Sequence, residues 1–156
     1  MTAGSSEIWC VGVGSSQGDD QAGWLVIDVL QDVSDGRLRL RKVGYPGELL
    51  DWIEPRGTLW IVDACRGWGK PGDWSCWSWP SEELPACLSV GTHDLGLTQV
   101  LKWAEALGRL PREVCVWGIW IDSADVGGGP TEPTLRAVAE LAAEMRRICH
   151  QPDELR

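Results

Sequence analysis

Residues 8–13 read IWCVGV and are followed directly by GSSQGDD at residues 14–20. The first stretch is a short apolar run that ends at a glycine, which predicts a strand buried on both faces. The polar turn leads into residues 20–33, where apolar side chains recur with the period of a helix. A buried strand, a polar turn and a helix in this order indicate an α/β fold.

Four more segments have the character of strands. Residues 59–62 and 114–121 are apolar throughout, as in parallel strands that helices cover on both faces. Leu38 and Leu40 alternate with basic residues, which is typical of a strand nearer the edge of a sheet. Residues 73–79, in a part of the chain rich in Gly, Pro, Ser and Trp, are compatible with a fifth strand.

Helices are expected between and after these strands. Residues 95–107 carry apolar side chains at helical spacing, and Gly108 suits the end of a helix. The last helix is expected over residues 131–149, with a proline in its first turn. Its buried stripe is predicted to consist of Leu135, Val138, Leu141, Ala142, Met145 and Ile148. The whole pattern predicts a single domain over residues 1–156 with a three-layer α/β/α architecture.

The charge of the chain restricts its partners. The formal net charge is −9, and residues 1–36 and 71–94 contain acidic residues but no Lys or Arg. Because a phosphate backbone is bound by clustered basic side chains, this composition argues against nucleic acid and favours a cation. No apolar run is long enough to span a membrane, and the first residues lack the features of a signal peptide. We therefore expect no membrane partner and a cytoplasmic location.

Cysteine and tryptophan are both frequent. None of the six cysteines forms a C-x-x-C pair, which argues against a zinc ribbon, and Cys10 and Cys115 are expected to be small buried residues. There are 11 tryptophans and no phenylalanine. One group of tryptophans indicates either core packing or a contact surface for a protein partner. It consists of Trp68, Trp74, Trp77 and Trp79.

Three polar residues are candidates for a site, because ligands of α/β sheets bind beyond the carboxyl ends of the strands. Asp20 follows the first strand, Asp63 follows residues 59–62, and His93 precedes the next helix. Two carboxylates and an imidazole would bind a divalent metal and leave coordination positions open. Each residue also has a structural interpretation: Asp19 or Asp20 as a helix cap, Asp63 as a turn former, and His93 as a structural histidine.

A nucleotide site is a competing interpretation of the first turn. Gly12, Gly14 and Gly18 loosely resemble a dinucleotide-binding fingerprint. The spacing is off by one residue, however, and Asp19 and Asp20 would repel a phosphate at this position.

The same residues resemble the motifs of the hydrogenase maturation endopeptidases. GVGSSQGDDQAG at residues 12–23 is similar to the opening motif of that family, and IVDA at residues 61–64 to its second. THDLGL at residues 92–97 is similar to the third motif, which is the most distinctive. The resemblance extends from about residue 8 to the last helix.

The resemblance implies a reaction and a partner. Members of the family remove a C-terminal extension from the large-subunit precursor of a nickel–iron hydrogenase after the metal has been inserted. Their metal-contacting residues match Asp20, Asp63 and His93, which would be both catalytic and metal-binding, with nickel supplied by the substrate and no organic cofactor. The family fold is a mixed five-stranded sheet of order 2-1-3-5-4, in which strand 4 is antiparallel. Residues 73–79 would then be the antiparallel strand.

The sequence also departs from the family. Ser15 stands where members usually have Asn, and the loop is one residue shorter. In the region of the presumed substrate groove, Gly44, Tyr45 and Gly47 replace a Gly-Gly pair, and these three residues and Asp94 are expected to contact substrate. Two other functions remain open: a nickel-dependent checkpoint protein that binds the precursor without cutting it, and another hydrolase or nucleotide-binding protein on a similar scaffold.

Overall fold

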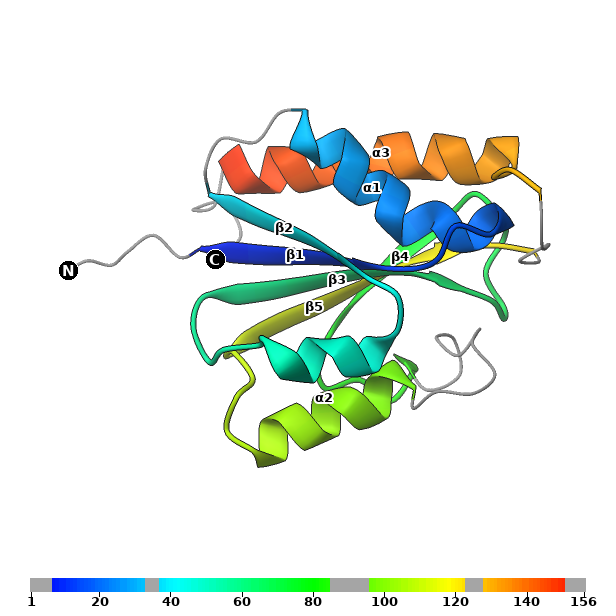
Figure 1. Cartoon of the computed structure of the whole chain (residues 1–156). Coiled ribbons are helices and arrows are strands. Elements are labelled where there is room, and N and C mark those ends of the chain that lie inside the picture. Colours follow the sequence, from blue (N-terminus) through cyan, green and yellow to red (C-terminus); the bar gives the residue numbers. More distant parts are fainter. Residues whose placement is uncertain (1–6, 33–36, 85–95, 123–127, 151–156) are drawn as a thin grey trace.

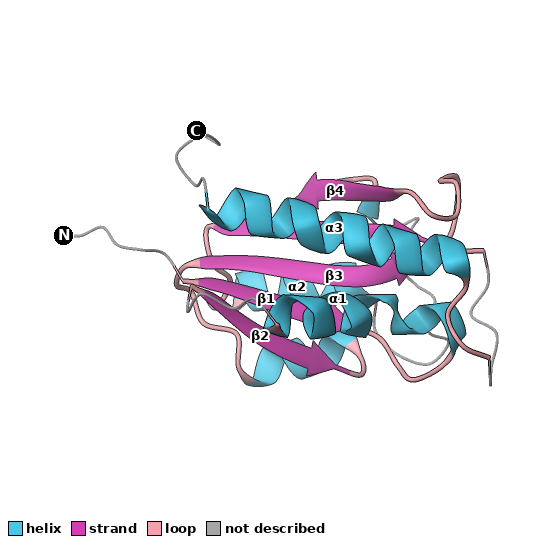
Figure 2. Cartoon of the chain, turned by 90° about the horizontal axis from the view of Figure 1, so that it is seen from above, coloured by secondary structure: helices cyan, strands magenta, loops and turns pink. Residues whose placement is uncertain are grey.

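A computed structural model describes residues 7–32, 37–84, 96–122 and 128–150 of the chain. A five-stranded sheet lies at its centre, with helices on both faces (Figures 1 and 2). The strands are β1 (Ile8–Val13), β2 (Leu38–Val43), β3 (Thr58–Cys65), β4 (Trp74–Ser78) and β5 (Glu113–Trp120). The α-helices are α1 (Ala22–Gln31), α2 (Leu97–Ala106) and α3 (Glu132–His150). Short 3-10 helices at η1 (Gly18–Gln21) and η2 (Pro46–Asp51) follow β1 and β2.

The strand order is β2-β1-β3-β5-β4. Strands β2, β1, β3 and β5 pair in parallel, and β4 pairs with β5 antiparallel at one edge. This order and the antiparallel fourth strand confirm the predicted α/β fold. No helix of the described residues is long and apolar enough to cross a membrane.

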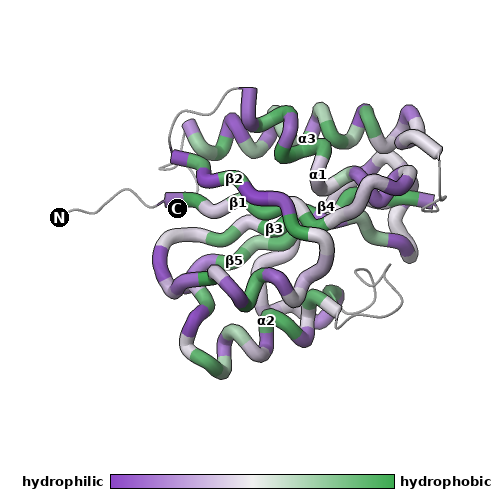
Figure 3. The backbone as a smooth tube through the Cα atoms, viewed as in Figure 1, coloured by the Kyte–Doolittle hydropathy of each residue, from purple (hydrophilic) through white to green (hydrophobic). Residues whose placement is uncertain are grey.

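Two hydrophobic cores form because side chains alternate across the sheet. Cys10 and Val62 face α1 and α3, whereas Val11, Ile61 and Cys65 face α2 and η2. Figure 3 shows hydrophobic residues concentrated along the central strands and hydrophobic and hydrophilic residues alternating along the helices. The sheet therefore separates two cores, as its apolar strands predict.

Two details of the packing differ from the sequence predictions. Leu135 is 47% exposed, because the buried stripe of α3 begins at Thr134 and a neighbouring helical residue points about 100° away from it. Cys115 is only half-buried, whereas Cys10 is fully buried as predicted. Cys115 lies on β5 beside the short edge strand, where less of the chain covers it.

Two glycines bring the start of α1 against the sheet. A Cβ on Gly23 would lie 2.6 Å from the carbonyl oxygen of Val62 and even closer to that of Val13. A Cβ on Gly12 would in turn collide with the backbone of Gly23. Only residues without a side chain permit this approach. As a result, the turn that carries the acidic residues lies over the carboxyl ends of β1 and β3.

Candidate active site

Asp63 is a buried carboxylic acid within the sheet. It lies inside β3, which continues to Cys65, and not after the strand as predicted, because pairing with β5 extends to the end of that strand. Its side chain is on the α2 face, and the residue is 8% exposed. Burial raises the pKa of Asp63 well above its usual value, and the charge of Asp20 raises it further, while a hydrogen bond from the backbone of Ala64 acts in the opposite direction.

Asp20 reaches the same place from a different element. It lies on η1, the next element after β1, and is half-buried. Its backbone N–H donates to the carbonyl of Gln17 at 2.9 Å, and its carbonyl accepts from the N–H of Ser15 at 3.3 Å. These bonds close the turn that holds the Asp20 side chain. Because its charge acts on the pKa of Asp63, the structure brings together two of the three predicted ligands.

Asp19, the neighbour of Asp20, has a structural role. It is 3% exposed, and its carboxylate accepts hydrogen bonds from the backbone N–H of Thr131 at 2.6 Å and from the Thr131 hydroxyl at 3.0 and 3.1 Å. Thr131 directly precedes α3. Asp19 thus satisfies donors at the start of a distant helix, and its contacts separate it from the Asp20–Asp63 pair. A helix-capping role was predicted for one of the two aspartates, but not with this partner.

The predicted third ligand, His93, and the predicted substrate contact Asp94 lie outside the described residues. Helix α2 begins at Leu97, three residues after Asp94. The described residues alone contain no group of three His, Cys, Asp or Glu side chains that could hold a metal ion. Any three-ligand site that includes Asp20 and Asp63 therefore needs a donor from another part of the chain or from a partner.

Gly44, Tyr45 and Gly47 lie just beyond the carboxyl end of β2. The N–H of Gly44 donates to the carboxylate of Glu48 at 2.6 Å, and Tyr45 is 48% exposed. The carbonyl of Val43 ties this segment to the first turn, since it accepts from the N–H of Gly14 at 3.1 Å. These residues share an edge of the sheet with Asp20 and Asp63, and their contact with substrate stays a prediction.

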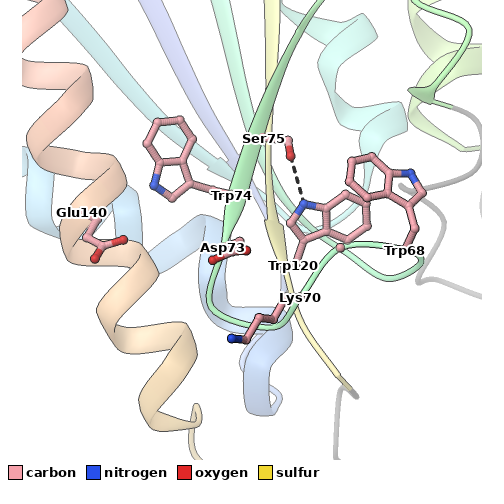
Figure 4. Close-up of a pocket in the computed structure, with 8 residues that line it drawn as sticks. Trp68, Lys70, Asp73, Trp74, Ser75, Trp120 and Glu140 are labelled. Atoms are coloured by element: carbon pink, nitrogen blue, oxygen red, sulfur yellow. Dashed lines mark hydrogen bonds between the residues drawn. The ribbon is translucent and has the colours of Figure 1, made fainter.

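The predicted tryptophan group divides between core and surface. Trp77 is buried in the α2-side core, whereas Trp68 is 69% exposed. Trp68 packs against Trp120 with ring centroids 4.6 Å apart. A pocket of about 350 Å³ opens beside them (Figure 4). Sequence analysis did not single out Trp120, because its apolar strand context is typical of an ordinary core residue.

The comparisons with known proteins agree with the resemblance seen in the motifs. Residues 45–148 match the model of the hydrogenase maturation protease family. That range includes Asp63 and His93 but not Asp20, so the placement of Asp20 beside Asp63 rests on the structure. A search of curated proteins found no match.

Several solved structures have the same fold. An endopeptidase from Escherichia coli is 26% identical with a TM-score of 0.73, over 89% of this chain and 88% of that one. The hydrogenase maturating endopeptidase HybD from E. coli is 24% identical with a TM-score of 0.70, over 90% of this chain and 93% of that one. The [NiFe] hydrogenase maturation protease HycI from Thermococcus kodakarensis KOD1 is 22% identical with a TM-score of 0.70, over 92% of each chain.

Proposed function

The chain belongs to the hydrogenase maturation protease family, and we propose that it removes the C-terminal extension of a [NiFe] hydrogenase large-subunit precursor after nickel insertion. The observation that carries this proposal is the pair of carboxyl groups from Asp20 and Asp63 at the carboxyl edge of the sheet. Acidic residues of this kind are suited to a cationic centre and not to an anionic ligand.

Nickel in this proposal is part of the substrate. Two carboxyl groups that interact unfavourably, one of them buried, are stabilised when a cation lies between them. Asp20 and Asp63 would therefore bind the exposed side of nickel held by the precursor, with His93 as the third ligand. A bound nickel ion would supply polarisation of the scissile carbonyl or of a water molecule.

The chain's own residues would position the substrate and move a proton. Binding at a fixed metal centre would hold an otherwise flexible tail close to the site, which lowers the entropic cost of reaching the transition state. One of the two carboxylates would accept a proton from the attacking water molecule.

The direct test is incubation of the purified protein with nickel-loaded precursor, with shortening followed by mass spectrometry. Asp20→Asn, Asp63→Asn and His93→Ala should each slow cleavage by about 100-fold or more. Asp28→Asn is the matched control, because Asp28 is an acid on α1 that pairs with Lys42 on the surface. Cleavage at the wild-type rate by all three site variants would refute the site assignment.

A second arm separates the proposed function from the checkpoint alternative. Precursor without nickel should be neither cleaved nor bound tightly. If nickel-loaded precursor binds the wild-type protein and is never shortened, the chain is a binding protein and the endopeptidase proposal is wrong.

A further inference from the structure

The outer edge of β4 is a second surface on which a polypeptide can bind. Strand β4 is the last strand in the sheet order and pairs with β5 on one side only. In the part of the chain that the structure describes, no strand pairs with its other side. An unpaired edge of this kind is a template for an added strand.

The hydrogen bonds to β5 show which backbone groups of β4 face outward. The N–H of Trp79 donates to β5 at 2.9 Å, and the carbonyl of Asp73 accepts from β5 at 3.0 Å. In an antiparallel pair, alternate residues direct both backbone groups to the same neighbour. Trp74, Cys76 and Ser78 therefore direct their N–H and C=O groups away from the sheet, and Cys76 and Ser78 are exposed.

A pocket lies beside the first residues of this edge (Figure 4). Trp74 and Trp120 lie on opposite sides of the β4 ribbon, and Ser75 accepts a hydrogen bond from the Trp120 indole N–H at 3.0 Å. The pocket is therefore lined by residues from both faces of the sheet, at the edge that β4 forms. Its lining consists of Trp68, Gly69, Lys70, Asp73, Trp74, Ser75, Trp120 and Glu140.

The charge of this region favours a basic occupant. The pocket contains two carboxylates, from Asp73 and Glu140, and one amine, from Lys70. The described residues 71–84, which include β4, contain three acids and no Lys or Arg. Strand β4 itself has no charged residue and no proline, so it lacks the devices that commonly protect an exposed edge.

The register of the sheet places this edge close to the candidate active site. Asp63 is opposite Gly118 on β5, and Gly118 is opposite Ser75 on β4. Since neighbouring strands are about 4.8 Å apart, Ser75 lies about 10 Å from Asp63 across the sheet. A strand added outside β4 would lie about 14 Å from Asp63, and an extended chain rises about 3.3 Å per residue. A segment bound at the edge is therefore at least about four residues away from a bond held at Asp63.

We propose that the outer edge of β4, with the pocket beside Trp68, binds a segment of the polypeptide substrate by strand addition. The segment is extended and positively charged. The identity of the segment as part of the substrate rests on the function proposed above. The outward backbone groups bind the segment along its length, and the exposed Trp68 and the acidic pocket contact its side chains. Binding orders one stretch of a flexible tail beside the active site.

A proline substitution tests the outward hydrogen bonds without disturbing the sheet. Cys76→Pro removes an N–H that points away from β5, at a position where an edge strand tolerates proline. The ligand is a short fluorescein-labelled peptide with lysines at alternate positions, and its binding is measured by anisotropy. The Cys76→Pro variant should bind this peptide with a Kd about tenfold higher than the wild-type protein. Cys76→Ala keeps the N–H and is the matched control, and Trp68→Ala should also weaken binding. Folding of each variant is checked by its thermal transition.

The peptide itself supplies a second test that does not depend on the variant. N-methylation of alternate residues on one edge of the peptide should abolish binding, and methylation on the other edge should leave it intact. A glutamate version of the peptide should bind more weakly than the lysine version. Equal binding by both N-methylated peptides, or undiminished binding by folded Cys76→Pro, would overturn the proposal. The proposal would also be wrong if the protein did not bind the peptide but self-associated, and if Cys76→Pro abolished this self-association. The edge would then bind a second copy of the chain.

The role in the reaction has its own readout. Cys76→Pro should raise KM for nickel-loaded precursor and leave kcat unchanged, whereas Asp63→Asn should lower kcat and leave peptide binding unchanged. Peptide binding needs neither nickel nor cleavage, so it can succeed where the proposed function fails. If precursor is cleaved with an unchanged KM by Cys76→Pro, the bound segment is not part of the substrate and this inference alone is wrong.

Discussion

Replacement of Asp19 should destabilise the protein far more than replacement of an ordinary acidic residue. Its carboxylate accepts hydrogen bonds from the backbone and the hydroxyl of Thr131, and the residue is 3% exposed. A hydrogen bond to a charged group contributes about 1.5–3 kcal/mol. Because Thr131 is exposed and water can replace its lost partner, we expect Asp19→Ala to lower the free energy of unfolding by about 1.5–3 kcal/mol.

This change is large enough to measure by two methods. In a protein of 156 residues, each kcal/mol shifts the thermal midpoint by about 2–4 °C, so Asp19→Ala should lower it by about 3–12 °C. Urea unfolding followed by tryptophan fluorescence gives the free energy directly. Asp28→Ala is the control, because the exposed Asp28–Lys42 ion pair should contribute less than about 1 kcal/mol.

A double-mutant cycle identifies the partner. Thr131→Val removes the hydroxyl and keeps the backbone N–H, so it should cost about 1–1.5 kcal/mol. The losses from Asp19→Ala and Thr131→Val should add to more than the loss from the double variant, because both changes remove the same hydrogen bond. A loss of less than about 1 kcal/mol for Asp19→Ala, or full additivity with Thr131→Val, would refute the argument from these contacts.

Three further predictions concern stability. Burial and a neighbouring charge raise the pKa of Asp63, so the folded state loses stability as the pH rises above 3.8 toward that raised pKa. In metal-free buffer, the free energy of unfolding from urea titrations should become higher for Asp63→Asn relative to wild type as the pH rises. A difference that becomes smaller with rising pH would contradict this. A Cβ on Gly23 would lie within 2.6 Å of carbonyl oxygens of β1 and β3, so Gly23→Ala should cost about 1–3 kcal/mol, whereas Gly129→Ala, with open space around it, should be neutral. By calorimetry, Leu141→Ala should lower the free energy of unfolding by about 2–5 kcal/mol, because Leu141 is fully buried. Leu135→Ala should lower it by less than about 1 kcal/mol, because Leu135 is half-exposed. Similar losses at both positions would be inconsistent with the packing of α3.

The arrangement of the sheet was predictable because its strands are strongly patterned. Strands β1, β3 and β5 are mostly apolar, as is typical of parallel strands between two helical layers. The antiparallel fourth strand came instead from resemblance to a known family, since its five residues have too little periodicity to predict pairing. The convergence of Asp20 and Asp63 followed from the general rule that sites form at the carboxyl ends of such strands.

The sequence pattern could not predict contacts between distant segments of the chain. Asp19 and Asp20 are adjacent and chemically identical, yet Asp19 bonds to a residue 112 positions away and Asp20 acts on Asp63. Similarly, one helical position separates the buried Thr134 from the exposed Leu135. Local preference does not distinguish the two aspartates and favours the wrong member of the second pair, because the difference arises from what packs against these residues.

By itself, the sequence determined the layers of the fold, the candidate acids and the family resemblance, since these depend on local apolar periodicity and on short motifs. Only the tertiary structure decided which aspartate holds α3 and which lies beside Asp63, that Asp63 is buried with a raised pKa, and which backbone groups of β4 face outward. The physical reason is that hydrogen-bond partners, burial and strand register depend on residues far apart in the chain, and they become defined only when the sheet and its helices pack together.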